Sequence, residues 1–137
     1  MSSEKRCDIC QKKFSGYGNN PAPLRASVCC DECNLKIVVP LRIYQSTKEP
    51  TSALLFKQDG SVTKIKPKGT YFTLKELQTL VGGLIELYPK RLHDHLIVCN
   101  EEGLLLDLEP NDVFRKYANI TLMGDVLLCP VAIFEEL

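Results

Sequence analysis

One stretch organises the first third of this chain. It begins with Cys7-Asp8-Ile9-Cys10 and ends with Cys30-Asp31-Glu32-Cys33. Each cysteine pair encloses two residues, the gap found in zinc knuckles, and nineteen residues separate the pairs. Four thiolates at this spacing are typical of structural zinc sites with a closed tetrahedral shell. We therefore predict one structural zinc ion bound by Cys7, Cys10, Cys30 and Cys33.

An internal echo chooses between the adjacent residues Cys29 and Cys30. Residues 7–14 and 30–37 share the pattern Cys-Asp-x-Cys-amide-x-Lys-apolar. Only Cys30 has the matching aspartate and the two-residue gap, so Cys30 is the predicted ligand. Cys29 is then a spare thiol packed beside the site, or a competing ligand. A reduced cysteine cluster without metal is the remaining alternative.

The segments around the cysteines predict a knuckle, a loop and a helix. Residues 15–23 are rich in Gly, Asn and Pro, which predicts a turn-rich loop. After Cys30, first-turn acids and apolar residues at helical spacing predict a helix, which Pro40 should end or kink. The apolar residues of this predicted face are Leu35, Val38 and Val39. This order favours a treble-clef arrangement, and a plain zinc ribbon with a second hairpin is the alternative.

The chain divides into two predicted domains. Residues 1–45 form the zinc module, which we expect to depend on its metal, because so short a segment with few large apolar side chains buries too little surface to offset chain entropy. Residues 46–52 are polar with one proline and are predicted to form a linker. Residues 53–137 form the second domain.

The second domain is predicted to be α+β, with a mixed, mainly antiparallel sheet, one main helix and one short helix. Apolar segments at 53–56 and 62–66 flank Asp59-Gly60, which predicts a hairpin. The capping box Thr73-Leu74-Lys75-Glu76 begins the main helix, and Gly82-Gly83 ends it. Further strands are predicted at 84–88, 95–99, 104–106 and 125–134, and the short helix at 111–117.

Composition favours a soluble protein of a reducing cytoplasm. Hydrophobic residues make up 45% of the chain, and no apolar run approaches the roughly eighteen residues of a membrane span. The residues before Cys7 leave no room for a secretory signal, and seven cysteines in a reducing compartment favour metal over disulfides. Net charge is zero, and the zinc-loaded first domain keeps only about +1. Bulk charge therefore argues weakly for nucleic acid.

The chemistry favours a protein that is not an enzyme. Four cysteines leave no open position for catalysis at zinc, and residues 1–92 contain no histidine to act as a base. His93-Asp94-His95 could direct two imidazoles to one side of a strand, but a third ligand is lacking. We interpret these residues as a polar entry to a strand and predict no catalytic or cofactor-binding residue besides the zinc ligands.

Four short stretches of the second domain carry a resemblance to a known family. They are Leu77-Gln78-Thr79-Leu80-Val81-Gly82-Gly83-Leu84-Ile85-Glu86, Asn100-Glu101-Glu102-Gly103, Pro110-Asn111 and Gly124-Asp125. Through them the segment from Ala53 to Phe134 resembles an uncharacterised domain family of phages, prophages and bacterial mobile elements. Residues 1–45 are similar to small zinc modules of phage proteins. The resemblances imply a phage or prophage origin and no activity that can be transferred.

The predicted function is binding without catalysis. We expect a phage-type accessory protein that captures a host protein or a small ligand in the host cytoplasm and so regulates or counteracts a host process. The candidate contacts are polar or glycine positions of the family-like stretches, for which turn chemistry and helix capping are alternative roles. They are Glu101, Glu102, Gly103, Asn111 and Asp125.

The alternative function is zinc-dependent binding of nucleic acid. Basic residues interleaved with aromatic ones can contact phosphates and stack on bases. The candidates are Lys12, Lys13, Phe14, Tyr17, Arg25, Lys36, Arg42 and Tyr44. The same pattern also fits a solvated surface with Phe14 packed against the metal site.

Overall fold

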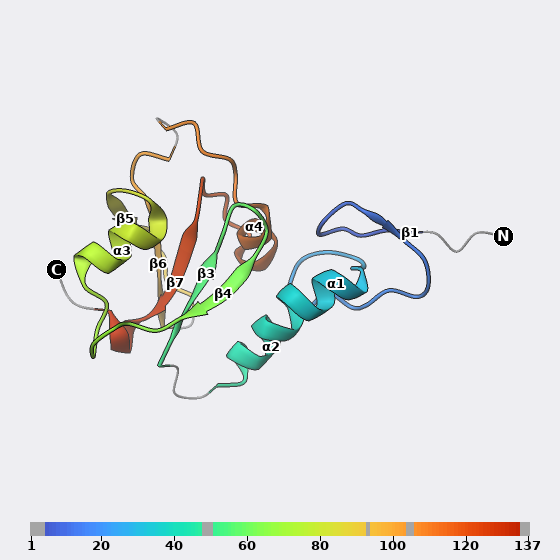
Figure 1. Ribbon diagram of the computed structural model, residues 1–137, viewed down its shortest axis with the longest axis horizontal. Helices are drawn as coiled ribbons and strands as arrows, with labels where there is room; N and C mark the ends of the chain where they lie inside the picture. Colours follow the sequence, from blue (N-terminus) through green and yellow to red (C-terminus); the bar gives the residue numbers. More distant parts are fainter. Residues whose placement is uncertain (1–4, 48–50, 93, 104–105, 135–137) are drawn as a thin grey trace.

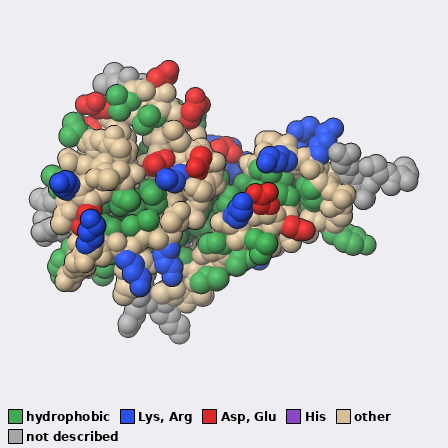
Figure 2. Space-filling view, in the orientation of Figure 1, with side chains coloured by type: hydrophobic (Ala, Val, Ile, Leu, Met, Phe, Trp, Pro, Cys, Tyr) green, Lys and Arg blue, Asp and Glu red, His purple; other side chains and the backbone are tan. Residues whose placement is uncertain are grey.

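The computed structural model of the chain describes residues 5–47, 51–92, 94–103 and 106–134. It is an α+β structure with a two-stranded and a five-stranded sheet, both antiparallel, which confirms the predicted fold class. Figure 1 shows the two parts side by side: a cysteine half (residues 5–47) and a sheet half (residues 51–134). In the same view, Lys and Arg side chains gather over the end of the cysteine half near the N-terminus (Figure 2).

The cysteine half consists of a minimal hairpin followed by one helical rod. Its elements are strands β1 (Lys5–Arg6) and β2 (Lys13–Phe14), helix α1 (Asp31–Cys33), the π-helical segment η1 (Asn34–Val38) and helix α2 (Val39–Gln45). Strands of two residues cannot support a fold alone, so the loops and the rod must be held by other contacts.

The helical rod does not end at Pro40. Of the two outcomes predicted for this proline, an end or a kink of the helix, the first is therefore wrong. It continues to Gln45, and Pro40 stands in the first turn of α2, directly after η1. Proline lacks an N–H and clashes with the carbonyl four residues earlier, and the wider π-type turn, in which Val39 N–H bonds Asn34 O, accommodates it. This local change also turns Leu35 outward, where it is exposed, while Ile37 is buried instead.

The sheet half is one antiparallel sheet with the strand order β4-β3-β7-β6-β5. Its elements are β3 (Ala53–Phe56), β4 (Val62–Ile65), α3 (Leu74–Val81), β5 (Ile85–Leu87), β6 (His95–Asn100), α4 (Asp112–Ala118), β7 (Val126–Pro130) and the 3₁₀ turn η2 (Val131–Ile133). The last predicted strand, 125–134, is therefore too long at its end. Residues 104 and 105 of the strand predicted at 104–106 lie outside the described residues.

The turn and cap signals of the sheet half fold as the sequence predicts. Strands β3 and β4 pair from Ala53↔Ile65 to Phe56↔Val62. Thr73 and Glu76 form the reciprocal capping box of α3, and Gly82 ends that helix with a φ of 81°. These local signals hold because each satisfies backbone groups that the element itself leaves unpaired.

The two faces of the large sheet pack on different partners. Alternate residues of a strand point to opposite faces. Ala53 and Leu55 of β3 pack with α3 residues Leu77 and Val81 in one cluster. The second face, which includes Leu54 and Phe56, belongs to another core.

This second core is shared between the two halves. Its buried residues come from the sheet, from α4 and from the helical rod of the cysteine half. They include Leu54, Phe56, Ile97, Val126, Leu128, Val113, Phe114, Ile37, Val38, Leu41 and Tyr44, together with Cys7, Cys29 and Cys33. The rod and α4 thus cover the sheet face opposite α3. Among the described residues, no helix is long and apolar enough to cross a membrane.

Candidate metal centre and junction groove

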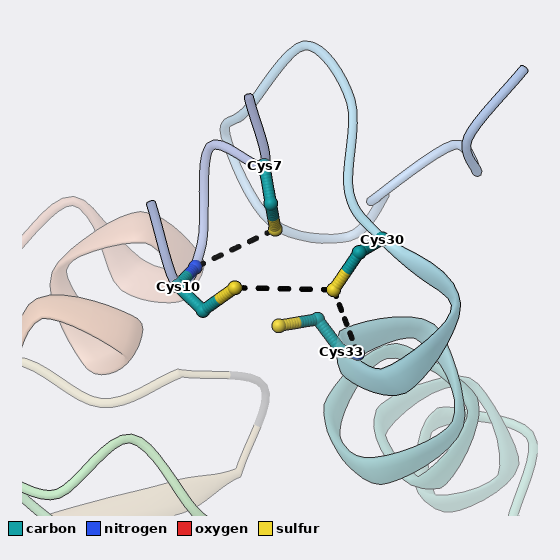
Figure 3. A group of neighbouring side chains, drawn as sticks. All are labelled: Cys7, Cys10, Cys30 and Cys33. Carbon is teal, nitrogen blue, oxygen red and sulfur yellow. Dashed lines mark hydrogen bonds between the residues drawn. The ribbon is translucent and has the colours of Figure 1, made fainter. Parts of the chain in front are cut away.

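Four cysteine side chains converge in the cysteine half. The Sγ atoms of Cys7, Cys10, Cys30 and Cys33 all lie within 4.8 Å of one another, and they point toward a common centre (Figure 3). The Cys10 and Cys30 Sγ atoms are 3.8 Å apart. A tetrahedral ion with bonds of about 2.3 Å to sulfur separates its ligands by about 3.8 Å. The donor set therefore fits a tetrahedral thiolate-bound metal such as zinc, and the predicted four-cysteine group is present.

The two cysteine pairs are positioned by different local structures. Between the strands of the hairpin, Cys7 N–H donates to Lys12 O at 2.9 Å, and Gln11 N–H to Cys7 O at 2.9 Å. Gln11 has a φ of 66°, which closes this tight turn. The second pair stands at the start of the helical rod, with Cys30 as the N-cap of α1. A helix rather than a second hairpin supplies these thiols, in agreement with the favoured treble-clef arrangement and not with the zinc-ribbon alternative.

Backbone N–H groups point at the sulfur atoms. Ile9 N and Cys10 N lie 3.3 and 3.5 Å from Cys7 Sγ, and Cys33 N lies 3.5 Å from Cys30 Sγ. Burial opposes ionisation of Cys7, but backbone N–H groups of Cys10, Cys30 and Ile9 outweigh it and lower the pKa of this thiol to about 7. These N–H groups thus stabilise the thiolate of Cys7, the form that binds metal, whereas burial raises the pKa of Cys10 and Cys33.

The two aspartates of the sequence echo brace the centre from outside. Asp8 accepts hydrogen bonds from both the N–H (2.8 Å) and the hydroxyl of Ser27, which lowers its pKa. Asp31 accepts from Asn19 Nδ2 at 2.9 Å. Each aspartate therefore fastens its cysteine pair to the loop between the pairs, and this explains why the echo includes them.

Cys29 stays apart from the four converging thiols. It is fully buried, and its backbone exchanges two hydrogen bonds with Asn19, at 2.9 and 3.0 Å. Burial, and secondly the negative charges of Cys7 and Cys30, raise the pKa of Cys29 to about 11. A neutral, buried thiol is a packing residue of the core.

Tyr44 connects the two halves at the end of the helical rod. Its hydroxyl donates to Ser52 O at 2.8 Å and lies 2.8 Å from His95 Nε2. Because a tyrosine hydroxyl has one proton, His95 Nε2 is the donor in the second bond. His95 is thus engaged at the start of β6, and its predicted companion His93 lies outside the described residues.

Beside this contact lies a groove of about 980 Å³ between the halves, which we call the junction groove. Its walls come from the end of α2 and Thr47, from Thr51, from residues 91, 92, 94 and 95, from α4, and from β7 with the turn after it. They include Tyr44, Gln45, Arg91, His95, Tyr117 and Ala132. Gln45 Nε2 donates to the Tyr117 hydroxyl at 3.4 Å across the groove. No local motif marks these residues, because they come from segments that lie far apart in the chain.

The predicted partner contacts lie at the other end of the sheet. Strand β6 begins at His95, opposite Pro130, and ends at Asn100, so the turn after it is far along the strands from the junction groove. Glu101 is exposed in that turn, and Glu102 N–H donates to Asn100 Oδ1 at 2.8 Å. These two glutamates remain available to a partner.

The other three candidates fulfil structural roles in this end of the sheet. Gly103 is buried against Met123, and a Cβ there would lie 3.0 Å from the Met123 Cβ. Asp125 Oδ1 accepts from Gln58 N–H at 2.9 Å and ties β7 to the turn between β3 and β4. Turn chemistry, the alternative role considered for Glu101-Glu102-Gly103, accounts for Gly103, and the hydrogen bond to Gln58 accounts for Asp125.

Asn111 is a buried cap, not a surface contact. It is 1% exposed, and its Oδ1 accepts from Phe114 N–H at 3.0 Å at the start of α4. Its Nδ2 donates to Phe56 O at 2.7 Å and Gly124 O at 2.8 Å. All its hydrogen bonds are used inside the fold, so no polar atom of this side chain faces a partner.

Several residues of the alternative nucleic-acid surface are likewise occupied. Arg42 donates to Ala22 O and Asn20 O, both at 2.7 Å, and Lys36 pairs with Glu32 at 2.8 Å. Tyr44 is buried at the junction, as described above. Among the described residues, Lys13 and Arg25 form no ion pair, and neither do the hairpin cations Lys5 and Arg6, which were not among the predicted candidates.

Comparison with known proteins gives one match. The family model described as a domain of unknown function, DUF3846, matches residues 51–134. No curated protein and no solved structure matches the chain significantly.

Proposed function

Because the chain belongs to the DUF3846 family, whose description names no activity, we propose from its own geometry that it is a non-enzymatic binding protein with one structural zinc ion. The junction groove is the observation that supports this proposal most. It captures a small ligand or a short segment of a host protein, and the metal centre holds one of its walls in place.

The donor chemistry supports zinc in a structural role. Four cysteine thiolates suit zinc or an iron–sulfur cluster, and the 3.8 Å separation of two Sγ atoms suits a single tetrahedral ion. Four thiolates fill the shell of such an ion and leave no position for a substrate or an activated water. The metal then acts on folding, because a site of this kind forms only when the chain folds around it.

The size and lining of the junction groove support a binding role. Sites for small ligands usually enclose about 300–1,000 Å³, with apolar and aromatic walls and a few polar groups that fix orientation. The groove has Tyr117, Leu128 and Ile133 among its apolar walls, and Gln45, Arg91 and Asp94 as polar groups. Two hydrogen bonds inside the fold hold Tyr44, so this wall of the groove is fixed before any ligand arrives.

The proposed setting is the reducing cytoplasm of a host cell that carries a phage or a mobile element. All seven cysteines are free thiols in this fold, as the seven-cysteine composition favours in such a compartment. Capture of a host component there would regulate or counteract a host process.

A groove-filling substitution tests the proposal. Ala132 lines the groove and is exposed, so Ala132→Trp should occupy the space without disturbing the core. The matched control is Thr79→Trp on the outer surface of α3, away from the groove. The metal-loaded proteins are used to capture components of a host extract, with nuclease added to one arm, and captured proteins and small molecules are identified by mass spectrometry.

We expect a specific component to be captured by the wild type and by Thr79→Trp, to survive nuclease, and to be lost with Ala132→Trp. If Ala132→Trp still captures the component, the groove is not the binding site, and Glu101 and Glu102 become the candidate contacts. Capture that nuclease abolishes would favour the alternative function.

A further inference from the structure

The hairpin of the cysteine half carries three cations that are not neutralised by an ion pair among the described residues. Two of them reach only backbone carbonyls: Arg6 donates to Gln11 O at 2.8 Å, and Lys5 donates to Tyr17 O. In the register of β1 and β2, Arg6 lies directly opposite Lys13. Like charges at directly opposed positions of an antiparallel pair destabilise it. Within residues 5–47, 51–92, 94–103 and 106–134, no carboxylate lies within ion-pair distance of Lys5, Arg6 or Lys13.

An outward-facing aromatic ring stands beside these cations. Tyr17 is 95% exposed, and Lys5 Nζ donates to its backbone carbonyl at 3.2 Å. Gly16 and Gly18, with φ of 96° and 76°, direct the chain around it. Gly18 is pressed against the Phe14 ring and Val28, so that an added Cβ would lie 2.5 Å from Val28 Cγ2. The ring is therefore presented by a packed loop.

We propose that Lys5, Arg6, Lys13 and Tyr17, which we call the basic hairpin, bind single-stranded nucleic acid. Phosphates supply the negative charge that the opposed Arg6 and Lys13 lack, and the exposed Tyr17 ring offers a stacking face to one base. Figure 2 shows the Lys and Arg side chains gathered at this end of the molecule. An acidic peptide such as poly-glutamate would pair with the cations but offers no aromatic face to stack on the Tyr17 ring.

This surface is separate from the junction groove in position and in chemistry. The hairpin belongs to the start of the cysteine half, whereas the groove begins where α2 ends, at Tyr44 and Gln45. Nucleic-acid binding by the basic hairpin is therefore independent of what the junction groove binds. Nucleic acid could bring the protein to a place where the groove meets its own ligand.

The test is fluorescence anisotropy of a labelled twenty-nucleotide poly(dT) or poly(U) strand titrated with metal-loaded, full-length protein. Three phosphate contacts predict a salt slope, d log K/d log[salt], of about −2 for a single strand. Lys13→Gln removes one cation that makes no hydrogen bond in the described fold and should bring the slope closer to zero by about 0.7. Tyr17→Ser should weaken binding roughly 5- to 150-fold without changing the slope.

The matched control is Lys64→Gln, which makes the same charge change on exposed strand β4 of the sheet half. It should bind like the wild type, and all variants should retain one metal ion. The proposal is overturned by absent binding at 50 mM salt, or by equal losses in Lys13→Gln and Lys64→Gln. Equal or tighter binding of a DNA duplex or of poly-glutamate would also overturn it.

Discussion

The cysteine half and the sheet half become stable by different means. The cysteine half has two-residue strands, and its rod turns Leu35 and Ile43 to solvent. The sheet half has strands such as β3 and β7 in which every residue is buried. The cysteine half has short strands and no core of its own, so it must obtain stability from a metal. The sheet half is packed on both faces and obtains stability from apolar burial.

The difference is informative because the two halves nevertheless share one core. The buried face of the rod, with Val38 and Leu41, packs in the same cluster as Phe56 and Phe114 of the sheet half. The metal-dependent part thereby covers a sheet face that would otherwise be exposed to water. Each of the following experiments asks how far the stability of one half depends on the other.

Removal of the metal should have the largest effect. Structural zinc sites contribute on the order of 10–16 kcal/mol of apparent binding free energy, so a strong chelator should unfold the cysteine half. Hydrogen–deuterium exchange with mass spectrometry should then show lost protection in residues 5–47, while β3, β6 and β7 keep most of theirs. Simultaneous loss of protection in the sheet would contradict the comparison and would indicate one cooperative unit.

Two cysteine variants sharpen this experiment. Cys10→Ser removes a converging thiol and should reduce bound zinc, measured by mass spectrometry of the native protein. Cys29→Ala removes the neighbouring buried thiol and should keep one zinc ion per chain. The opposite pattern would make Cys29 the ligand.

In the sheet half, Asn111→Ala should be the most damaging polar substitution. The variant loses the cap of α4 and leaves the carbonyls of Phe56 and Gly124 without their donor. Together these losses cost about 3 kcal/mol of unfolding free energy, or roughly 10 °C in melting temperature. Thr73→Ala, which removes an exposed cap of α3, is the control and should cost about 1 kcal/mol.

Asn111→Ala also distinguishes the two roles considered for this residue. If Asn111 is a partner contact, the variant loses partner binding but keeps its stability. If Asn111 is a buried cap, the variant loses stability. An unchanged melting temperature in urea-free buffer would therefore restore Asn111 as a surface contact.

The sequence predicted what depends on neighbouring residues. The cysteine spacing, the capping box at Thr73 and the turn at Asp59-Gly60 each specify local geometry, and the structure agrees with all three. The echo chose Cys30 over Cys29 because a repeated local pattern implies a repeated local structure. At Pro40 the sequence left two outcomes open, an end or a kink of the helix, because a π-type turn has no sequence signature as clear as the proline that it accommodates.

What the sequence could not predict depends on residues far apart in the chain. Tyr44 meets His95, and Asn111 meets Phe56, only after the whole sheet has formed. The sequence could not show that Asn111 is buried, since a polar residue at the start of a helix caps equally well inside or outside the core. Burial makes Asn111 a structural cap and not a partner contact. The residues that line the junction groove come from segments far apart in the chain, so no sequence motif marks them.

A smaller effect is expected where α4 contacts the turn between Cys7 and Cys10. The Lys116 ammonium donates to Asp8 O and, at 2.9 Å, to Asp112 Oδ2, and its side chain is only 10% exposed. Lys116→Met keeps the packing of the stem but leaves the Asp8 carbonyl without this donor, at a cost of about 1–2 kcal/mol. Chemical denaturation of the zinc-loaded protein measures it.

Arg115→Met is the matched control for Lys116→Met. Arg115 binds the same carboxylate at 2.6 Å, but its side chain is 47% exposed, so the loss should be about 0.5 kcal/mol or less. Equal losses in the two variants would show that only the ion pair matters and that the contact with Asp8 does not connect the halves.

The smallest effect concerns the pH dependence of Asp112 itself. Burial raises the pKa of its carboxyl group, but hydrogen bonds from Lys116 and Arg115 outweigh this and lower the pKa below its ordinary value. A carboxyl group with a lowered pKa in the folded protein stabilises above the pKa of the unfolded chain, about 3.9, and loses this contribution as pH falls through the folded value. Because the group is half exposed, its contribution at neutral pH is at most about 1 kcal/mol.

Comparison of wild type with Asp112→Asn isolates this contribution, because both proteins release metal in the same way as their thiolates are protonated. The gap in unfolding free energy should be constant from pH 8 to pH 5 and should close below about pH 4. A gap that widens in acid would require a raised pKa and would contradict the pairing with Lys116. A gap that closes only when the metal is released would instead show that Asp112 acts through the knuckle, and that α4 and the metal centre unfold together.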